Sequence, residues 1–222
     1  MERIYILDIK GTNTANITNT LENIFNIKTI KTPEEIKDKK PNIVLPGNGS
    51  FGYYVNFLRQ NQWELKLKEI INNESSGKLF CICSGFQVLG FSSEESIGIK
   101  GLGLIDCTFK SLNNYFNHPL IINIGRKSIY ESSNSTRLKD LNFIKKQNIS
   151  NLMNPYFVHG YAAKFKNPLK KKEKKCCYLI NMINNEELLA GIISNNFCAT
   201  QFHPELSGKL WKDFIISFFN QK

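Results

Sequence analysis

The strongest constraint on the fold is a regular alternation of strand-like and helix-like segments between residues 3 and 89. Short apolar runs alternate with longer stretches in which apolar residues recur every three or four positions. Strands that alternate with helices in this way indicate parallel pairing, with helices covering both faces of the sheet. The pattern predicts strands at residues 3–8, 27–30, 42–45 and 78–82, and helices at 14–25, from Thr32-Pro33 onward, at 53–71 with a break near Asn61, and at 85–89.

The second half of the chain has a different pattern, in which short strands follow one another with turns between them. Strands are predicted at residues 156–158, 161–165, 177–183, 188–193 and 197–202. A closing helix is predicted at 208–220, with an apolar face made of Leu210, Trp211, Phe214, Ile215, Phe218 and Phe219. We therefore expect one domain over residues 1–222, an α/β three-layer sandwich with a mainly parallel, flavodoxin-like central sheet and an antiparallel region in its second half.

Composition narrows the class of protein. A chain of 222 residues is long enough to bury a core, and 41% hydrophobic with 22% charged residues is ordinary for a soluble globular protein. No apolar stretch approaches the ~20 residues needed to cross a bilayer, and Met1-Glu2-Arg3 does not resemble a signal peptide. We therefore expect a cytoplasmic protein with no membrane partner and with its six cysteines reduced.

The formal net charge is +10, and much of the excess lies in residues 170–175, which read Lys-Lys-Lys-Glu-Lys-Lys. We interpret this run as a solvated loop between two strands. A docking patch for an acidic partner or a phosphorylated substrate is the alternative. Because no aromatic residues interleave with these lysines, we expect no nucleic-acid partner.

Cys83 lies at the carboxyl end of a predicted strand and directly before a predicted helix. In such a tight elbow the helix N-terminus stabilises a thiolate, and the N–H group of Ser84 would point into the same space to bind an oxyanion. Gly85 lets the turn close without a clash. The turn at residues 46–49 also follows a strand, and ligands of parallel α/β sheets bind at this edge. An isolated cysteine, by contrast, is ordinarily a core residue.

A second polar segment, Gln201-Phe202-His203-Pro204-Glu205, follows the last predicted strand. Pro204 fixes the backbone between the histidine and the carboxylate. Glu205 can then bind the second nitrogen of the His203 ring, which fixes its tautomer and raises its basicity. With Cys83, these residues complete a set of nucleophile, base and orienting carboxylate.

The segments Cys83-Ser84-Gly85-Phe86-Gln87 and Gln201-Phe202-His203-Pro204-Glu205 resemble the paired signatures of class I (triad) glutamine amidotransferases. Within that group, further stretches are similar to the glutaminase subunit of imidazole glycerol phosphate synthase. These stretches are residues 46–52, 92–95, 101–105, 156–161 and 205–208, and they follow in order over nearly the whole chain.

The resemblance implies a reaction. Cys83 would attack the side-chain amide of glutamine, His203 would transfer the protons, and Glu205 would orient His203. Backbone N–H groups of Ser84 and of the loop Gly47-Asn48-Gly49 would hold the oxyanion.

The resemblance also implies a substrate site and a partner. Gln87 would contribute to the glutamine site, and His159 and Tyr161 would line the side that faces the partner. Ammonia would pass through a tunnel to a barrel-shaped synthase subunit, in a heterodimer that serves histidine biosynthesis. No cofactor and no metal are implied.

Four positions depart from the pattern of this subunit. Cys81 stands where glycine is usual, two residues before the nucleophile, and Asn48 replaces an apolar residue of the oxyanion loop. Residues 8–13 and 124–127 also differ from the usual Asp-Tyr-Gly-x-Gly-Asn and Gly-Trp-Asn. These departures leave the triad intact, but they fit a paralogous glutaminase that supplies ammonia for amidation of a surface sugar as well as they fit the histidine pathway.

Other interpretations remain for the protein and for single residues. Cys81 and Asn48 alone support a non-catalytic binding protein with this fold, and a peptidase or another amide hydrolase would use the same triad. Cys107 and Cys198 are expected in the core, and His118 is expected to face solvent. The spacing of the remaining cysteines misses the usual zinc-finger patterns, so no metal site is predicted.

Overall fold

The structure, a computed structural model, describes residues 1–117, 121–133, 135–141, 154–166 and 176–220. Its strands are β1 (Arg3–Leu7), β2 (Asn26–Ile30), β3 (Asn42–Leu45), β4 (Lys78–Ile82), β5 (Ser92–Ser93), β6 (Thr108–Ser111), β7 (Asn123–Arg126), β8 (Ile129–Glu131), β9 (Tyr156–His159), β10 (Tyr161–Ala162), β11 (Cys177–Ile183), β12 (Glu186–Ile193) and β13 (Phe197–Thr200). Its α-helices are α1 (Thr14–Leu21), α2 (Phe51–Gln60), α3 (Trp63–Asn72), α4 (Ser84–Gln87), α5 (Leu112–Phe116) and α6 (Lys209–Asn220). Short 3-10 turns are η1 (Pro33–Glu35), η2 (Glu74–Ser76), η3 (Glu94–Ser96), η4 (Leu138–Asp140) and η6 (Pro204–Leu206).

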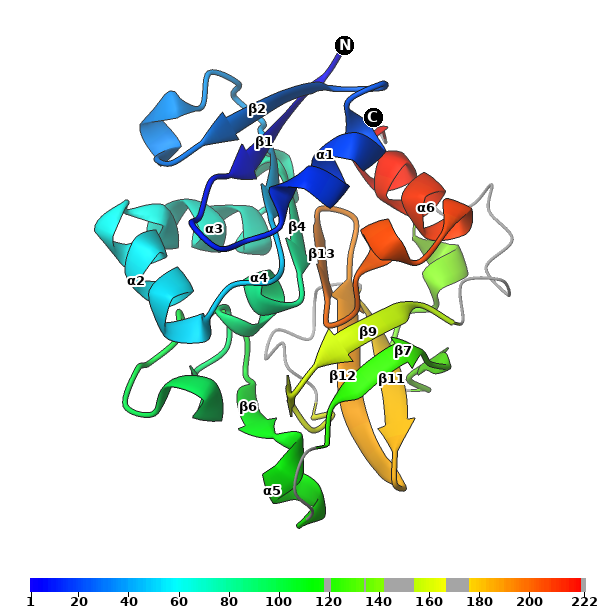
Figure 1. Cartoon of the computed structure of the whole chain (residues 1–222). Coiled ribbons are helices and arrows are strands. Elements are labelled where there is room, and N and C mark those ends of the chain that lie inside the picture. Colours follow the sequence, from blue (N-terminus) through cyan, green and yellow to red (C-terminus); the bar gives the residue numbers. More distant parts are fainter. Residues whose placement is uncertain (118–120, 134, 142–153, 167–175, 221–222) are drawn as a thin grey trace.

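Eight strands form the central sheet, in the order β2-β1-β3-β4-β13-β12-β11-β8. The strands from β2 to β13 run parallel to their neighbours, whereas β13–β12, β12–β11 and β11–β8 are antiparallel pairs. The mainly parallel sheet and its antiparallel region are thus confirmed. The two halves of the chain meet at the centre, where β4 pairs with β13 (Figure 1).

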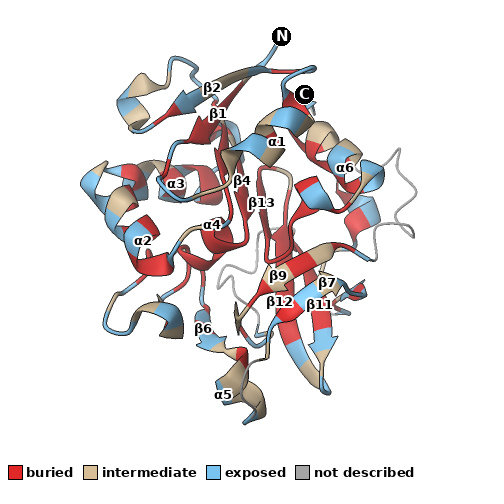
Figure 2. Ribbon diagram, viewed as in Figure 1, coloured by how far each residue is buried: buried red, intermediate tan, exposed pale blue. Residues whose placement is uncertain are grey.

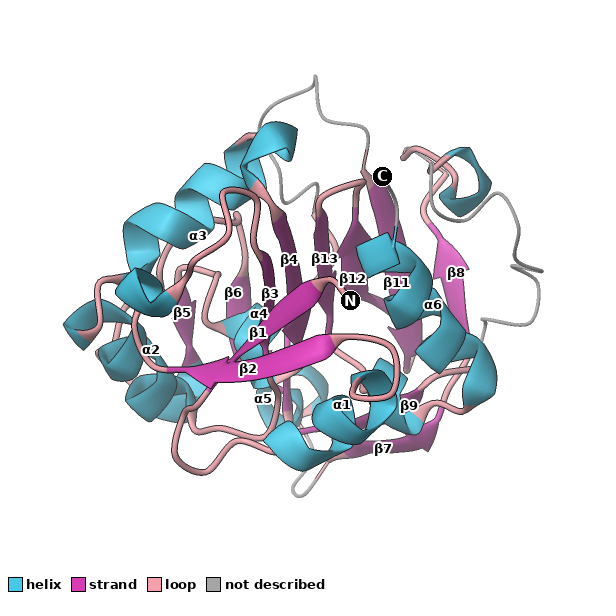
Figure 3. Ribbon diagram, turned by 90° about the horizontal axis from the view of Figure 1, so that it is seen from above, coloured by secondary structure: helices cyan, strands magenta, loops and turns pink. Residues whose placement is uncertain are grey.

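Two apolar clusters cover the opposite faces of the sheet. One contains the buried side chains of α2 and α3, and the other contains those of α1 and α6. Figure 3 shows these helix pairs on the two sides of the strands, and Figure 2 shows the burial of the central strands. Burial on both faces explains why these strands read as continuous apolar runs, and it confirms the predicted three layers.

Several helix boundaries differ from the prediction. Helix α1 ends at Leu21, and the N–H groups of Ile24 and Phe25 both bond to the Leu21 carbonyl in the turn that follows. The Thr32-Pro33 pair begins only the single turn η1. The break near Asn61 is confirmed, since Gln62 has a left-handed φ of 58° between α2 and α3.

The prediction is wrong for one residue of the apolar face of α6. Leu210 is exposed, whereas the other five residues of that face are buried. The burial of Cys107 and Cys198 is confirmed. His118 and the lysine run 170–175 lie outside the described residues.

Two small sheets lie beside the central one. Strands β10, β6 and β5 form the first, and the antiparallel pair β7–β9 forms the second. Within the described ranges, no helix is long and apolar enough to span a bilayer.

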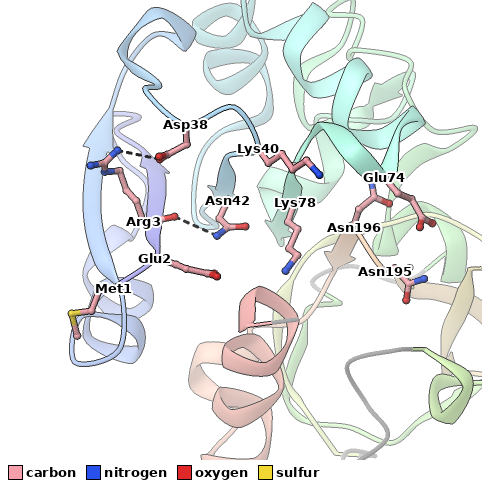
Figure 4. Close-up of a pocket in the computed structure, with 11 residues that line it drawn as sticks. Met1, Glu2, Arg3, Asp38, Lys40, Asn42, Glu74, Lys78, Asn195 and Asn196 are labelled. Carbon is pink, nitrogen blue, oxygen red and sulfur yellow. Dashed lines mark hydrogen bonds and ion pairs between the residues drawn. The ribbon is translucent and has the colours of Figure 1, made fainter. Parts of the chain in front are cut away.

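The amino ends of the central strands surround an open cavity of about 570 Å³. Arg3, Asn42 and Lys78 begin β1, β3 and β4, and all three line it, together with Asn196 just before β13 (Figure 4). The carboxyl ends of the same strands lie at the opposite edge of the sheet, where Cys83 and residues 46–49 follow β4 and β3.

Candidate active site

Cys83 occupies a sharp elbow between β4 and α4. Its backbone has φ 48° and ψ −107°, a conformation that is costly for a residue with a side chain. The elbow is held from both sides: the Cys83 N–H donates to the Thr200 carbonyl at 2.7 Å, and the Cys83 carbonyl accepts from the N–H groups of Phe86 and Gln87. Strain of this kind persists where surrounding bonds fix it, and it is typical of functional sites.

Gly85 allows α4 to pack tightly against β3. A Cβ atom at this position would lie 2.5 Å from the Leu45 carbonyl oxygen, so any larger residue would push the elbow away from the sheet. The helix that follows is shorter than predicted, with only the four residues of α4.

Cys81 does not crowd the nucleophile position. Its side chain packs in the cluster of α2 and α3, whereas the Cys83 side chain belongs to the cluster of α1 and α6. Burial raises the pKa of the Cys81 thiol well above its usual value, which keeps the group neutral. The residue that replaces the usual glycine is therefore accommodated on the other face of the sheet.

His203 and Glu205 form a buried pair after β13. The Nδ1 atom of His203 lies 2.7 Å from Glu205 Oε1, and both side chains are almost fully buried. The His203 N–H donates to the Tyr156 carbonyl, and the Ser207 hydroxyl donates to the His203 carbonyl. Strand β9 and the turn η6 therefore fix the histidine backbone, and Glu205 fixes its ring.

The free edge of the His203 ring is directed to the Cys83 region. A Cβ atom on Gly47 would lie 2.8 Å from His203 Cε1 and 3.2 Å from Cys83 Cβ, so both side chains border the same small space. His203 Nε2 is buried and has no hydrogen-bond partner among the described residues. Burial alone would lower the pKa of His203, but its interactions with Cys83 and Glu205 raise that pKa to about 10.

The loop predicted to hold an oxyanion lies beside this pair. Asn48 has a left-handed φ of 67°, which asparagine tolerates better than most residues do. The Gly49 N–H donates to the Ser84 hydroxyl at 2.9 Å, and the Gly47 carbonyl accepts from the Asn13 N–H. The structure thus brings Ser84 and the loop together, but the Gly49 N–H is already bonded.

Gln87, His159 and Tyr161 meet at one backbone carbonyl. The Gln87 Nε2 atom lies 3.1 Å from the Tyr161 carbonyl oxygen, and His159 Nδ1 lies 3.0 Å from the same oxygen. His159 is buried, so both of its ring nitrogens bond inside the chain. A role of His159 and Tyr161 on the partner-facing side stays a prediction.

Two residues of this region were not predicted as site residues. The amide of Gln201 contacts both Gln87 and the Cys83 sulfur, and Asn123 bonds to His159. Gln201 lies within the motif around His203, so its position was a usable signal. Nothing in the sequence around Asn123 indicated its contact, because β7 has only four residues.

The arrangement can perform covalent chemistry on a carbonyl carbon. A thiol stands beside an imidazole whose other nitrogen is held by a carboxylate, and this is the constellation of a nucleophile activated by a base. In the part of the chain that the structure describes, no group of three or more His, Cys, Asp or Glu side chains is placed to hold a metal ion.

Comparisons with known proteins agree with this chemistry. The sequence model of the family described as glutamine amidotransferase class-I matches residues 5–221. The imidazole glycerol phosphate synthase subunit HisH of Prochlorococcus marinus subsp. pastoris is 32% identical over 218 residues, which cover 94% of this chain and 93% of that protein. The imidazole glycerol phosphate synthase hisHF of Emericella nidulans is 29% identical over 213 residues, or 94% of this chain, but this chain spans only 36% of that protein.

Solved structures share the fold at lower sequence identity. A structure described as PurLQS from Thermotoga maritima has a TM-score of 0.65 and 17% identity, and the match covers 99% of this chain and 98% of that one. A crystal structure described as glutamine amidotransferase has a TM-score of 0.62 and 16% identity, and the match covers 97% and 96% of the two chains.

Proposed function

The chain belongs to the class-I glutamine amidotransferase family and is a glutamine-hydrolysing enzyme, and from this premise we propose that Cys83, His203 and Glu205 are its catalytic triad. The observation that carries the proposal is the buried His203–Glu205 pair beside the strained Cys83 elbow, at the carboxyl ends of β4 and β13. The proposal takes residues 1–222 as one domain, because both core clusters draw side chains from both halves of the chain.

The first half-reaction begins from an ion pair. In the proposed ion pair His203, whose pKa is raised to about 10, has taken the proton of the Cys83 thiol. The sulfur attacks the side-chain carbonyl carbon of glutamine, and the oxyanion accepts from the Ser84 N–H and from the 47–49 loop. Since the Gly49 N–H is bonded to Ser84, the loop donor in this proposal is Asn48 or Gly47. His203 then protonates the amide nitrogen, the C–N bond breaks, and ammonia leaves a thioester behind.

The second half-reaction restores the thiolate. Neutral His203 takes a proton from water as the water oxygen attacks the thioester carbonyl carbon. The C–S bond breaks and the electron pair returns to sulfur, which regenerates the ion pair. The product acid ionises to glutamate. Glu205 orients the His203 ring through Nδ1 in both half-reactions.

We propose that the ammonia passes to a barrel-shaped synthase subunit in a heterodimer, within histidine biosynthesis in the cytoplasm. The support is that similar proteins are named imidazole glycerol phosphate synthase subunit HisH, and that fungal and plant relatives are hisHF proteins of which this chain spans about a third. These names favour the histidine pathway over the alternative of amidating a surface sugar.

The test measures glutamate release with the partner subunit and its substrate present. Cys83→Ala should lower the rate by at least about 10⁴-fold, because no other group supplies the covalent step. Cys81→Ala is the matched control, since it removes a buried thiol two residues away on the other face of the sheet, and it should retain the rate within about threefold. A glutamine analogue with a reactive ketone should label Cys83, as read by peptide mass spectrometry. Undiminished release by Cys83→Ala would refute the proposed function.

A further inference from the structure

Gln201 lies between the end of β13 and His203, and its side chain is almost fully buried. Its Nε2 atom lies 3.7 Å from the Cys83 sulfur, and its Oε1 atom lies 3.1 Å from Gln87 Nε2. The proposed triad does not involve this side chain. Gln201 can act on the sulfur as a hydrogen-bond donor only if the NH₂ end of its amide faces Cys83.

The Tyr161 carbonyl fixes the orientation of the Gln87 side-chain amide. A carbonyl oxygen only accepts hydrogen bonds, so the group of Gln87 that lies 3.1 Å away must be its NH₂. The same NH₂ group has a second hydrogen, which is directed to Gln201. Gln87 therefore presents a donor to Gln201, whatever the protonation of the residues around it.

Gln201 must accept this hydrogen bond with its side-chain oxygen. Its Oε1 atom accepts from Gln87, and the other end of the same amide, the NH₂ group, is thereby turned to the Cys83 sulfur. The direction of the amide at the sulfur thus follows from a backbone carbonyl through two side chains. If the Gln201 amide were reversed, its NH₂ group would face the NH₂ group of Gln87. Neither of these two buried donors would then have an acceptor in the other.

His159 holds the same carbonyl from its other side. Its Nδ1–H donates to the Tyr161 oxygen, and its Nε2 accepts from Asn123 Nδ2 at 2.9 Å. Asn123 Nδ2 also donates to Asn181 Oδ1, which fixes the direction of the Asn123 amide in turn. Burial lowers the pKa of His159 to about 4, so the ring stays neutral near pH 7 and keeps one donor and one acceptor.

We propose that Gln201 donates a hydrogen bond to the Cys83 sulfur, which stabilises the thiolate and holds it in place for attack on the glutamine carbonyl carbon. Gln87 and His159 act through it as positioning residues. The inference rests on the proposed function, in which Cys83 is the nucleophile. The bond strengthens the ion pair before attack, since a hydrogen bond to a charged acceptor is worth more than one to a neutral acceptor.

The first experiment compares two nearly isosteric variants. Gln201→Met removes both ends of the amide, and Gln201→Glu keeps the acceptor for Gln87 but removes the donor to sulfur. Alkylation of Cys83 by iodoacetamide at pH 7 should slow by about tenfold in Gln201→Met and by more in Gln201→Glu, where an anionic oxygen faces the sulfur. Gln60→Met, the same change on an exposed glutamine of α2, should react as the wild type does.

Turnover of glutamine separates positioning from folding. With the partner present, kcat should fall by about the factor seen in alkylation, whereas KM should stay within about threefold, because the bond acts on the nucleophile and not on binding. Folded variants with wild-type alkylation and wild-type kcat would overturn the inference. Iodoacetamide needs no glutamine site, so its reaction tests the Gln201–Cys83 contact even if Cys83→Ala shows that the proposed function is wrong.

A measurement on the folded wild type covers the case in which both variants fail to fold. The side-chain amide protons of Gln201, assigned by NMR through contacts to the Cys83 β protons, should shift when iodoacetamide caps the sulfur. The amide protons of Gln60 should not move. Unchanged Gln201 amide protons after complete alkylation would contradict the proposal.

Discussion

At the carboxyl ends of β4 and β13 the polar side chains are buried and bonded to one another, whereas at the amino ends of the same strands they surround an open cavity. Cys83, Gln201, His203 and Glu205 are all buried at the first edge. At the second edge Arg3 and Asp38 form an ion pair 3.1 Å long, and their side chains are 34% and 42% exposed (Figure 4). One sheet therefore holds polar groups in two very different environments.

The difference teaches which groups depend on their neighbours. Water reaches the amino-end cavity, so a charge there is solvated even when its partner is removed, and exposed ion pairs contribute little to stability. At the carboxyl end each buried group depends on one or two protein partners, and the loss of one leaves the next unsatisfied. Substitutions should therefore have large chemical effects at one edge and small effects at the other.

The largest effect is expected from His203→Asn. The variant loses the group that carries the proton between sulfur, ammonia and water, so glutamate release should fall by at least about 10⁵-fold. A steady-state glutamate assay with the partner present measures it, with Cys81→Ala as the control for buried substitutions. A fall of less than tenfold in a folded variant would remove His203 from the reaction.

Glu205→Gln should follow, with a loss of about 10³-fold to 10⁴-fold in kcat. An amide in place of the carboxylate no longer selects the proper ring tautomer and no longer raises the pKa of His203. NMR titration of the His203 ring should show this pKa moving down from about 10 in the variant. If the ring titrates as in the wild type, Glu205 does not act on His203.

Gly47→Ala should retain the fold and lose about 100-fold in turnover, because a displacement of about 1 Å at reacting groups has an effect of this size. The added methyl group would lie 2.8 Å from His203 Cε1 and 3.2 Å from Cys83 Cβ, which forces the two apart. Gly160→Ala is the matched control, since its Cβ would meet no atom within 4 Å and its backbone is not left-handed. Equal turnover by Gly47→Ala and Gly160→Ala would show that the space between Cys83 and His203 tolerates a methyl group.

Lys78→Met changes a charged residue at the other edge. Lys78 begins β4, the same strand that ends at Cys83, and its Nζ donates to the Phe219 carbonyl at the end of α6. Since the amino-end cavity is distant from the triad along the whole strand, turnover should change by less than about twofold. A loss above tenfold, with an unchanged melting temperature, would mean that the two edges are coupled.

The last prediction concerns the pH dependence of stability, in which the two edges should have opposite signs. The pKa of His203 is raised from 6.5 to about 10, so its contribution is complete below pH 6.5 and is lost as pH rises toward 10. The pKa of Lys78 is lowered from 10.5 to about 8, so the folded state becomes relatively more stable between pH 8 and 10.5. Urea unfolding between pH 6.5 and 10.5 measures the free energy of unfolding. Its fall with rising pH should be absent in His203→Asn, and its rise should be absent in Lys78→Met.

The sequence predicted the layers and the triad neighbourhood because both depend on local patterns. Apolar runs of strand length identified the central strands, and the residues directly after β4 and β13 had to meet at one edge. The pattern could not fix the ends of α1, because Phe25 packs on the same core without being helical. Strands β5 to β8 were missed, since segments of two to four residues carry too little alternation to detect.

The contacts around the nucleophile were beyond local patterns. Gln201 reaches Gln87, 114 positions away, and Asn123 reaches His159 across the β7–β9 pair. Neither contact has a spacing rule, since each depends on how distant segments are packed. The bonded Gly49 N–H likewise follows from the position of Ser84 and not from the Gly-Asn-Gly sequence.

The Tyr161 carbonyl, from which the amide directions follow, belongs to the main chain. Point mutation exchanges side chains and leaves this oxygen in place, so substitutions at position 161 should not reverse the polarity of the site. Side chains such as Cys81 and Asn48 can therefore change while the backbone carbonyl that orients the Gln201 amide stays in place. Part of the active-site geometry is therefore set by the backbone fold, which single side-chain substitutions do not remove.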